Sequence, residues 1–304
     1  MEVKKVGIIR GGTGGFYEVS LQEGSEMLLH LTTHLSNKWK PIDFFVDKNG
    51  SWYEKGIPIS NKEIYNRADM FWDTTRDDCY ILTRSSKIAN VSGGYSSFTG
   101  DKEKILEEHL RNFDVKIPRH IIIPSFQKDF DEDIERYSIK KTKAVLEKFS
   151  PPWRVRSFPL NPREKYLLIR TVPELVNAIE IFAMKNKSVF IEEYIKGKKE
   201  VTHSILDYRG KDVYVFPFLR NSSLDGKNGE KETIERLVKN LHQNLFRTHY
   251  VNAEFILGPK KDIYLSHFEF SPDISEKSHL QESSELIGEK VSNILEHILK
   301  RTLR

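Results

Sequence analysis

The first 35 residues constrain the fold most, because an apolar strand, a glycine-rich loop and a helical pattern follow one another there. The apolar run Val3–Ile9 leads into the loop Arg10–Gly15, in which four of the six residues are glycine. Apolar residues then recur at helical spacing over 19–35. A strand, a glycine loop and a helix in this order predict the opening of an open α/β sheet.

Further strand signals follow this opening. Residues 41–47 predict a second strand, and the stretch 47–50 is a turn signal before an aromatic segment. Short apolar runs at 70–72 and 88–91 are candidates for additional strands. We therefore expect the first 98 residues to form one doubly wound α/β domain.

The remainder of the chain alternates helical and strand patterns. Its final part predicts a hairpin of strands 252–257 and 263–270, and one closing helix over about 284–303. The other expected helices cover about 99–112, 135–149, 173–183 and 232–246, and the other expected strands cover 153–158, 189–194, 201–206 and 212–218.

Composition excludes several classes of protein. A hydrophobic content of 38% with 30% charged residues is typical of a globular chain. The net charge of +4 is too small to indicate a nucleic-acid surface, although it suits a protein that handles a polyphosphate in one cleft.

No apolar run reaches the roughly 18–20 residues of a membrane helix, and the start does not read as a signal peptide, so we expect a cytoplasmic protein. The single cysteine, Cys79, forms no internal disulfide and has no partner at metal-ligand spacing.

Four segments, in the same order, resemble those of D-alanine–D-alanine ligases, an ATP-grasp family. They are Val6–Gly24, with its glycine loop and Glu-Val-Ser-Leu helix start, Gly100–Ile121, Val189–Thr202 and Asn252–Pro272. The resemblance implies an α/β ATP-grasp fold with three lobes. Residues 1–98 would form the preATP-grasp lobe, 99–188 the central small lobe and 189–304 the C-terminal lobe.

Two acidic residues of the predicted hairpin are candidate metal ligands. Glu254 and Glu269 lie on consecutive strands, so their carboxylates converge if both face the same side. A carboxylate pair next to triphosphate oxygens suits Mg²⁺, a hard cation that prefers oxygen ligands. The resemblance implies that Glu254 and Glu269 bind Mg²⁺ (or Mn²⁺), with Ser271 where the family has asparagine. The alternative is a solvated hairpin face with unrelated acids.

The resemblance also implies a set of ATP-binding residues. Lys102 and Arg156 match two lysines that contact the phosphates, and arginine at the second position keeps the charge while changing the geometry. Glu200 is placed to bind the ribose hydroxyls. For Lys102 a solvated helix-start lysine is the alternative, and for Glu200 a surface acid. In the adenine hinge that the resemblance implies, Glu192 follows the apolar strand 189–191, and the backbone of Glu193, Tyr194 and Ile195 would read the adenine edge.

The amino-acid half of the implied site departs most from the family. Glu18 matches an acid that orients the first substrate, although a carboxylate there also suits the helix dipole. The arginine that stabilises the oxyanion in the family falls on Asn252, whose amide donates a hydrogen bond without charge. Three family loops are altered: the phosphate lid at Phe158–Lys165 has no glycine, and Trp72–Asp78 and Asn221–Glu230 replace two substrate loops.

These observations leave three hypotheses for function. The first is an ATP-dependent carboxylate–amine ligase that works through an acyl phosphate, with Glu18, Arg156 and Asn252 in the catalytic roles. The second is a nucleotide-binding relative that has lost ligase activity and acts as a binding protein. The third is a ligase that modifies a larger substrate. The expected partners are ATP and a small amino-acid-like substrate, without nucleic acid or membrane, and a homodimer is an open alternative to a monomer.

Overall fold

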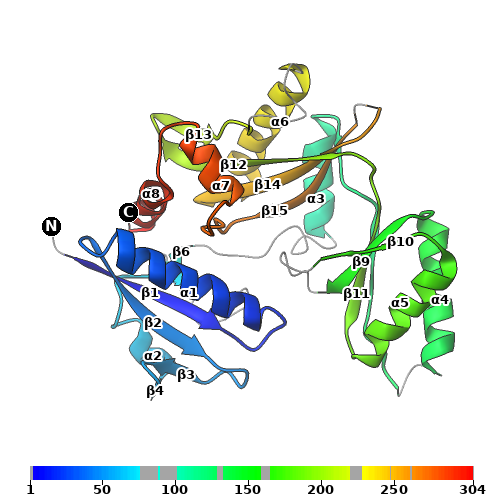
Figure 1. Ribbon diagram of the computed structural model, residues 1–304, viewed down its shortest axis with the longest axis horizontal. Coiled ribbons are helices and arrows are strands. Elements are labelled where there is room, and N and C mark those ends of the chain that lie inside the picture. Colours follow the sequence, from blue (N-terminus) through cyan, green and yellow to red (C-terminus); the bar gives the residue numbers. More distant parts are fainter. Residues whose placement is uncertain are drawn as a thin grey trace. The chain divides into compact units, whose positions relative to one another are not determined.

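A computed structural model describes residues 3–75, 88–89, 101–128, 133–158, 165–219, 228–246, 248–260 and 262–303 (Figure 1). The chain divides into two compact units. Unit 1 contains Met1–Ser97, Glu200–Phe255 and His267–Arg304, and unit 2 contains Phe98–Lys199 and Ile256–Ser266. The three lobes expected from the sequence, with boundaries at 98 and 188, stay a prediction. In the described part of the chain, no helix is long and apolar enough to cross a membrane.

Unit 1 contains a six-stranded sheet of order β4-β3-β2-β1-β5-β6. The four strands β2, β1, β5 and β6 are parallel, and β3 and β4 add an antiparallel edge. The β1 residues Val6–Ile9 are all buried, as expected for a parallel strand that is covered on both faces. The bounds are β1 Lys4–Gly11, β2 Trp39–Val46, β3 Trp52–Glu54, β4 Ile57–Ile59, β5 Met70–Asp73 and β6 Ile88–Ala89.

The glycine loop after β1 needs its first glycine for two reasons. Gly11 has a φ of +96°, and a Cβ at this position would lie 2.1 Å from the carbonyl oxygen of Val46. A side chain would therefore be strained in φ and would clash with the backbone of β2. The Gly11 amide instead donates a hydrogen bond of 2.9 Å to Ser20 Oγ, which ties the loop to helix α1 (Tyr17–His34).

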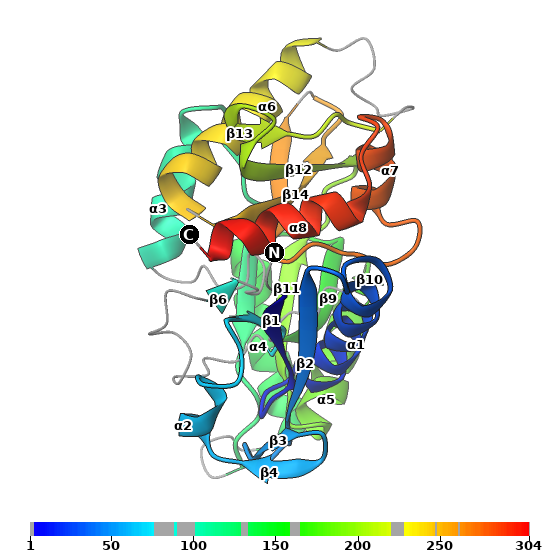
Figure 2. The same ribbon diagram turned by 90° about the vertical axis from the view of Figure 1, so that its left-hand side faces the viewer.

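The hydrophobic core of unit 1 contains residues from both the N-terminal and the C-terminal parts of the chain. Val6 and Ile8 of β1 belong to the same buried cluster as Met27 of α1 and as Ile294 and Leu295 of helix α8 (Val291–Thr302). Helix α8 contacts the end of the sheet at β6 (Figure 2). The C-terminal helix is therefore a structural part of the N-terminal sheet unit.

The expectation of one closing helix over 284–303 is wrong. Helix α7 (His279–Glu285) ends before Gly288, and α8 begins at Val291. Gly288 has a φ of +71°, its amide bonds to Glu285 O at 3.0 Å, and the Glu289 amide bonds to Ser284 O at 2.9 Å. This pair of hydrogen bonds with a left-handed glycine is a Schellman motif, which ends a helix by satisfying its last carbonyls.

A five-stranded sheet has the order β13-β12-β14-β15-β7, and its residues are divided between the two units. The hairpin expected from the sequence is present, because β14 and β15 are neighbours and the Gly258 amide bonds to Asp262 O at 2.8 Å. The bounds are β7 Val115–Lys116, β12 Lys198–Tyr208, β13 Lys211–Val215, β14 Tyr250–Leu257 and β15 Ile263–Glu269. Two further helices complete the unit 1 elements: α2 (Asn61–Ile64) and α6 (Asn228–Leu241), which continues as a π-helical turn at His242–Phe246.

Unit 2 is built on an antiparallel sheet of order β10-β9-β11-β8. Helices α4 and α5 lie against one face of this sheet (Figure 1). Asp133 caps α4 by accepting the Arg136 amide, and Thr171 caps α5 by accepting the Glu174 amide. The bounds are α3 Asp101–Arg111, β8 His120–Ile123, α4 Ile134–Lys148, β9 Trp153–Phe158, β10 Leu167–Ile169, α5 Val172–Met184 and β11 Ser188–Glu193.

Candidate nucleotide and metal site

The sheet of unit 2 has an apolar face and a charged face. Glu192 on β11 stands opposite Arg154 on β9, and Phe190 stands opposite Arg156. Directly paired residues point to the same side of a sheet, and successive residues alternate between sides. The intervening residues Val155 and Ile191 belong to the core formed with α4 and α5. The opposite side, which we call the charged face, carries His120, Arg154, Arg156, Phe190 and Glu192.

A buried ion pair lies at the centre of the charged face. Arg154 Nη1 is 3.3 Å from Glu192 Oε1, and the side chains of the two residues are only 7% and 2% exposed. The guanidinium carbon lies 4.8 Å from the ring centroid of Tyr166 and 5.6 Å from that of Tyr194. Arg154 Nε and Glu192 Oε2 are buried without a hydrogen-bond partner among the described residues. Buried polar atoms of native proteins are normally paired, so this donor and acceptor are available to a ligand or to water.

Arg156 adds a second guanidinium to the same face. It follows Arg154 by two residues on β9, which corresponds to a spacing of roughly 6.6 Å along the strand. Its guanidinium carbon lies 5.7 Å from the ring centroid of Phe190, and its buried Nε also has no partner within the described part of the chain. Two neighbouring guanidinium groups with open N–H donors suit the oxygens of an anion.

The backbone predicted to read the adenine edge, residues 193–195, begins at the last residue of β11. The Glu193 amide donates to Arg119 O at 2.8 Å, and the Tyr194 amide donates to Pro152 O at 3.0 Å. The Ile195 amide makes no backbone hydrogen bond within the residues that the structure describes. Within the described residues, the hinge backbone is thus hydrogen-bonded at its first two residues, while the third amide has no backbone partner.

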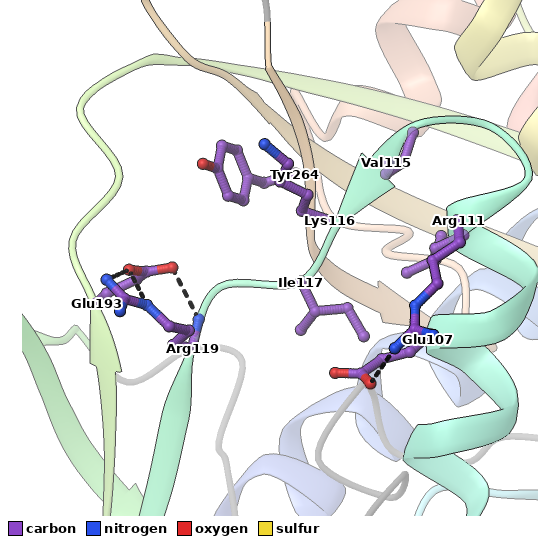
Figure 3. Close-up of a pocket in the computed structure, with 9 residues that line it drawn as sticks. Glu107, Arg111, Val115, Lys116, Ile117, Arg119, Glu193 and Tyr264 are labelled. Atoms are coloured by element: carbon purple, nitrogen blue, oxygen red, sulfur yellow. Dashed lines mark hydrogen bonds and ion pairs between the residues drawn. The ribbon is translucent and has the colours of Figure 1, made fainter. Parts of the chain in front are cut away.

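A pocket of about 440 Å³ lies beside the hinge within unit 2 (Figure 3). Glu193 lines it, and because Glu193 follows Glu192 on the strand, its side chain points away from the charged face. Arg119 Nη2 lies 2.7 Å from Glu193 Oε2, and Lys116 Nζ lies 2.8 Å from Asp262 Oδ1. The hydrogen bond that Arg119 donates to Glu193 raises the pKa of Arg119, and the hydrogen bond that Lys116 donates to Asp262 raises the pKa of Lys116. These charged side chains of the described pocket wall are therefore engaged in ion pairs.

The remaining predicted nucleotide residues belong to two different units. Lys102 lies in the first turn of α3 in unit 2, and its side chain is outside the described residues. Glu200 belongs to β12 in unit 1 and is 7% exposed. Their predicted contacts with phosphates and ribose stay predictions.

The predicted metal ligands belong to unit 1. Glu254 lies on β14 and Glu269 on the neighbouring β15, while Ser271, two residues further on, is 7% exposed. His267 Nε2 lies 3.2 Å from Glu269 Oε1. No group of three or more His, Cys, Asp or Glu side chains that could hold a metal ion occurs among the described residues. Two carboxylates and a hydroxyl are oxygen donors of the kind that Mg²⁺ prefers, so the residue types fit this ion.

A buried tyrosine–histidine pair supports the strands of this hairpin. The hydroxyl of Tyr250 on β14 lies 2.7 Å from His203 Nδ1. Burial lowers the pKa of His203 to about 3, with a further contribution from His279, so the ring is neutral and shares one uncharged hydrogen bond with the tyrosine hydroxyl. Burial and then the charge of Glu269 raise the pKa of Tyr250. The pair is therefore an uncharged hydrogen bond in the core next to a candidate metal ligand.

The predicted substrate residues are also placed in unit 1. Glu18 lies in the first turn of α1, where its side chain is 80% exposed and 3.8 Å from Lys48 Nζ. Asn252 lies on β14 two residues before Glu254, and its buried Oδ1 lacks a hydrogen-bond partner in the described residues. Most of the altered loops at 72–78, 158–165 and 221–230 lies outside the described residues.

Comparison with known proteins identifies relatives by structure and not by sequence. No protein-family model matches the sequence, and no curated protein matches it significantly. A D-alanyl-alanine synthetase A from Vibrio cholerae matches with a TM-score of 0.70 and 15% identity, over 100% of this chain and 99% of that one. The VanG D-Ala:D-Ser ligase from Enterococcus faecalis gives a TM-score of 0.69 at 14% identity, over 99% and 100% of the two chains.

A D-alanine–D-alanine ligase from Bacillus anthracis, solved in complex with ATP, matches with a TM-score of 0.63 and 18% identity over 100% of this chain and 98% of that one. The chain has the ATP-grasp fold of these ligases. The fold prediction is confirmed, whereas sequence identities this low do not show which reaction the chain catalyses.

Two residues of the candidate site were not identified from the sequence. Arg154 lies on the charged face, and Arg119 holds the side chain of Glu193. The pattern contained a signal for the first, because Arg154 and Arg156 alternate with Trp153 and Val155 and must share a sheet face. No local signal exists for the second, because Arg119 and Glu193 are 74 residues apart.

Proposed function

We propose that this protein is an ATP-dependent carboxylate–amine ligase. The observation that supports it best is the charged face of unit 2. There, the buried Nε donors of Arg154 and Arg156 have no hydrogen-bond partner among the described residues, on the strand that neighbours the hinge strand β11. An ATP-grasp fold with this face suits a nucleotide whose base reaches the hinge and whose phosphates reach the arginines.

The nucleotide contacts follow from the chemistry of the residues. The open Ile195 amide would donate to a ring nitrogen of adenine, while Arg156 and Lys102 would bind phosphate oxygens. The carboxylate of Glu200 would accept hydrogen bonds from the ribose hydroxyls. Glu193 and Tyr194 would contribute through their backbone, because the Glu193 side chain is engaged by Arg119.

The proposed reaction has two steps. A carboxylate oxygen of the first substrate attacks the γ-phosphorus of ATP, and ADP leaves to give an acyl phosphate. The amine of the second substrate then attacks the acyl carbon, phosphate leaves, and loss of a proton gives the amide. Arg156 would hold the transferred phosphoryl group, Asn252 would donate to the oxyanion, and Glu18 would orient the amine of the first substrate.

Glu254, Glu269 and Ser271 would hold Mg²⁺ or Mn²⁺, which when bound supplies positive charge to the phosphates. Small amino acids are the proposed substrate class, and the ligases of the same fold act on D-alanine and D-serine according to their names. A reaction that consumes ATP suits the cytoplasm, which we propose as the location.

A second candidate function is nucleotide binding without ligation. Asn252 favours it, because an amide at the oxyanion position supplies a hydrogen bond but no positive charge. Such a protein would bind ATP tightly and would release no phosphate in response to any amino acid.

A calorimetric titration combined with a phosphate-release assay separates these candidates. ATP is titrated into the protein with Mg²⁺, and phosphate release is measured with a panel of D- and L-amino acids. We expect ATP binding and release that depends on one or a few amino acids, and we expect Glu269→Gln to lower the rate at least tenfold. ATP binding without amino-acid-dependent release would favour the binding protein. Absence of ATP binding would contradict both candidates.

A further inference from the structure

We propose that Arg119 is a positioning residue of the nucleotide hinge, acting through its ion pair with Glu193. The inference rests on the proposed function, because it assigns a role to a residue that supports the ATP site. Arg119 would make no contact with ATP. It would hold the backbone that presents the Ile195 amide, and we call this pair the hinge clamp.

The hinge clamp fixes Glu193 through both its backbone and its side chain. The Arg119 amide donates to Glu193 Oε1 at 2.9 Å, and Arg119 Nε donates to Glu193 Oε2 at 2.8 Å. In return, the Glu193 amide donates to Arg119 O at 2.8 Å. Figure 3 shows the carboxylate of Glu193 meeting the guanidinium and the amide of Arg119. Three hydrogen bonds in different directions leave Glu193 little freedom, two residues before the open amide.

Arg119 is itself anchored to the end of helix α4. Its Nη1 donates to Lys148 O at 3.3 Å, and its guanidinium carbon lies 5.8 Å from the ring centroid of Phe149. The last carbonyls of a helix have no partner inside the helix, so an arginine there meets an otherwise open acceptor. One side chain therefore links β8, the hinge and α4 within unit 2.

The exposure of the hinge clamp separates positioning from overall stability. The Arg119 side chain is 63% exposed and that of Glu193 is 15% exposed, at the edge of the pocket in Figure 3. Ion pairs in which one partner is largely exposed to solvent contribute little to the free energy of unfolding. Removing the Arg119 side chain should therefore loosen the hinge while the protein stays folded.

The position of the hinge clamp predicts which part of the nucleotide it affects. A hinge amide distinguishes bases, because adenine and guanine present different groups to it, whereas arginines on the charged face contact phosphates that all nucleotides share. Loosening the hinge should therefore weaken the binding of ATP more than the binding of GTP. Removing a phosphate contact such as that of Arg156 should weaken the binding of both nucleotides alike.

The test measures dissociation constants of ATP and GTP for four variants and wild type. The variants are Arg119→Ala, Arg119→Lys, the charge swap Arg119→Glu with Glu193→Arg, and Arg136→Ala. Arg136 is the matched control, because it is 72% exposed and paired with Asp133 on the same unit. Thermal midpoints are recorded for each variant.

We expect Arg119→Ala to raise the dissociation constant of ATP by roughly threefold to tenfold, in line with the loss of one well-oriented hydrogen-bonded contact. The dissociation constant of GTP should change less than twofold, and the thermal midpoint should match that of Arg136→Ala. Lysine should recover only part of the ATP affinity, because it lacks the planar fork of arginine. The charge swap should recover part of it as well, because it restores the ion pair.

The outcomes distinguish this inference from the proposed function. A wild-type protein that binds no ATP overturns the proposed function and the hinge clamp together. A wild-type protein that binds ATP, with Arg119→Ala unchanged in affinity, overturns the hinge clamp alone. An equal loss of ATP and GTP affinity in Arg119→Ala also overturns it, because a base-reading hinge would not be involved.

Discussion

Gly197 lies between the hinge at Ile195 and the start of β12. A Cβ at this position would lie 2.3 Å from Leu257 O and 2.8 Å from the side chain of Ile256. Real side chains do not approach backbone oxygen so closely, so any other residue would move the chain away from the end of β14. The path from the hinge to Glu200 therefore depends on the absence of a side chain at one residue.

We expect Gly197→Ala to destabilise the protein by about 1–3 kcal/mol, the usual cost of forcing atoms into a packed position. ATP affinity should fall with it, because the hinge and Glu200 lie on either side of the displaced residue. Urea denaturation and ATP titration check the two effects. Gly229→Ala is the control, since a Cβ there meets nothing within 4 Å. Equal stability of the two variants would contradict the close approach.

At the scale of elements, β9 and β11 place a buried charge pair on the face that is not covered by α4 and α5. Glu192 is 2% exposed, so its carboxylate depends on Arg154 to offset the loss of hydration. The same two side chains retain a donor and an acceptor that have no partner in the part of the chain that the structure describes. The pair therefore contributes to the integrity of the sheet and is also suited to contact a ligand.

Single and double substitutions separate these two roles. We expect Arg154→Met to destabilise the protein by about 3–5 kcal/mol, because it leaves the Glu192 carboxylate buried without a counter-ion. Arg154→Met combined with Glu192→Met should regain much of that stability, because no buried charge remains. ATP affinity should stay weakened in both variants, as measured by calorimetry beside urea denaturation. A double variant no more stable than the single one would rule out an electrostatic role for the pair.

Local patterns predicted the elements of the candidate site well. The strand 153–158 was predicted with its observed bounds, because prolines precede it and apolar residues alternate along it. The single closing helix was wrong because its apolar pattern continues past Gly288, where backbone conformation and not hydrophobic periodicity ends the helix. The short strands β3, β4 and β10 were also not predicted as strands, since three residues carry too little periodicity.

Long-range contacts account for most of what the sequence left open at the site. Glu192 and Glu193 were predicted as neighbours with related roles, yet they point to opposite sides and pair with Arg154 and Arg119, respectively. Arg154 comes from the neighbouring strand β9 and Arg119 from the residue before β8, so the identity of both partners depends on register. Register is set by the packing of the whole sheet, which no local pattern contains.

At the scale of the whole molecule, two buried histidines link folding to pH. His242 accepts a hydrogen bond from Ser204 at Nδ1 and donates to Thr248 O from Nε2, both at 2.7 Å. Burial lowers the pKa of His242 to about 4 and that of His203 to about 3. Both rings are therefore neutral in the folded protein and become protonated more readily in the unfolded chain.

The contribution of the two histidines to the free energy of unfolding should be fully retained above pH 6.5, the ordinary pKa of histidine. It should fall as the pH drops from there toward 4, because the unfolded chain binds protons that the folded core excludes. His242 should account for roughly 3 kcal/mol of this loss. Urea denaturation at several pH values should show a shallower decline for His242→Gln than for wild type.

His109→Gln is the control for this measurement, because the hydrogen bond of His109 to Ile105 O is solvent-exposed. Its decline with pH should match that of wild type. His203→Gln should behave like His242→Gln, since burial is the main cause in both cases. Identical pH profiles for all four proteins would show that neither buried ring contributes.

The distribution of tryptophans has a practical consequence. The chain has four tryptophans, of which Trp39, Trp52 and Trp72 belong to unit 1 and Trp153 to unit 2. Trp153 is fully buried, its indole donates to Phe149 O at 3.2 Å, and its backbone pairs with Glu193. Incorporation of fluorotryptophan labels all four positions, and the fluorine NMR resonance of Trp153, assigned with Trp153→Phe, should report on the neighbourhood of the hinge. Titration of a nucleotide would then be visible at a fully buried probe.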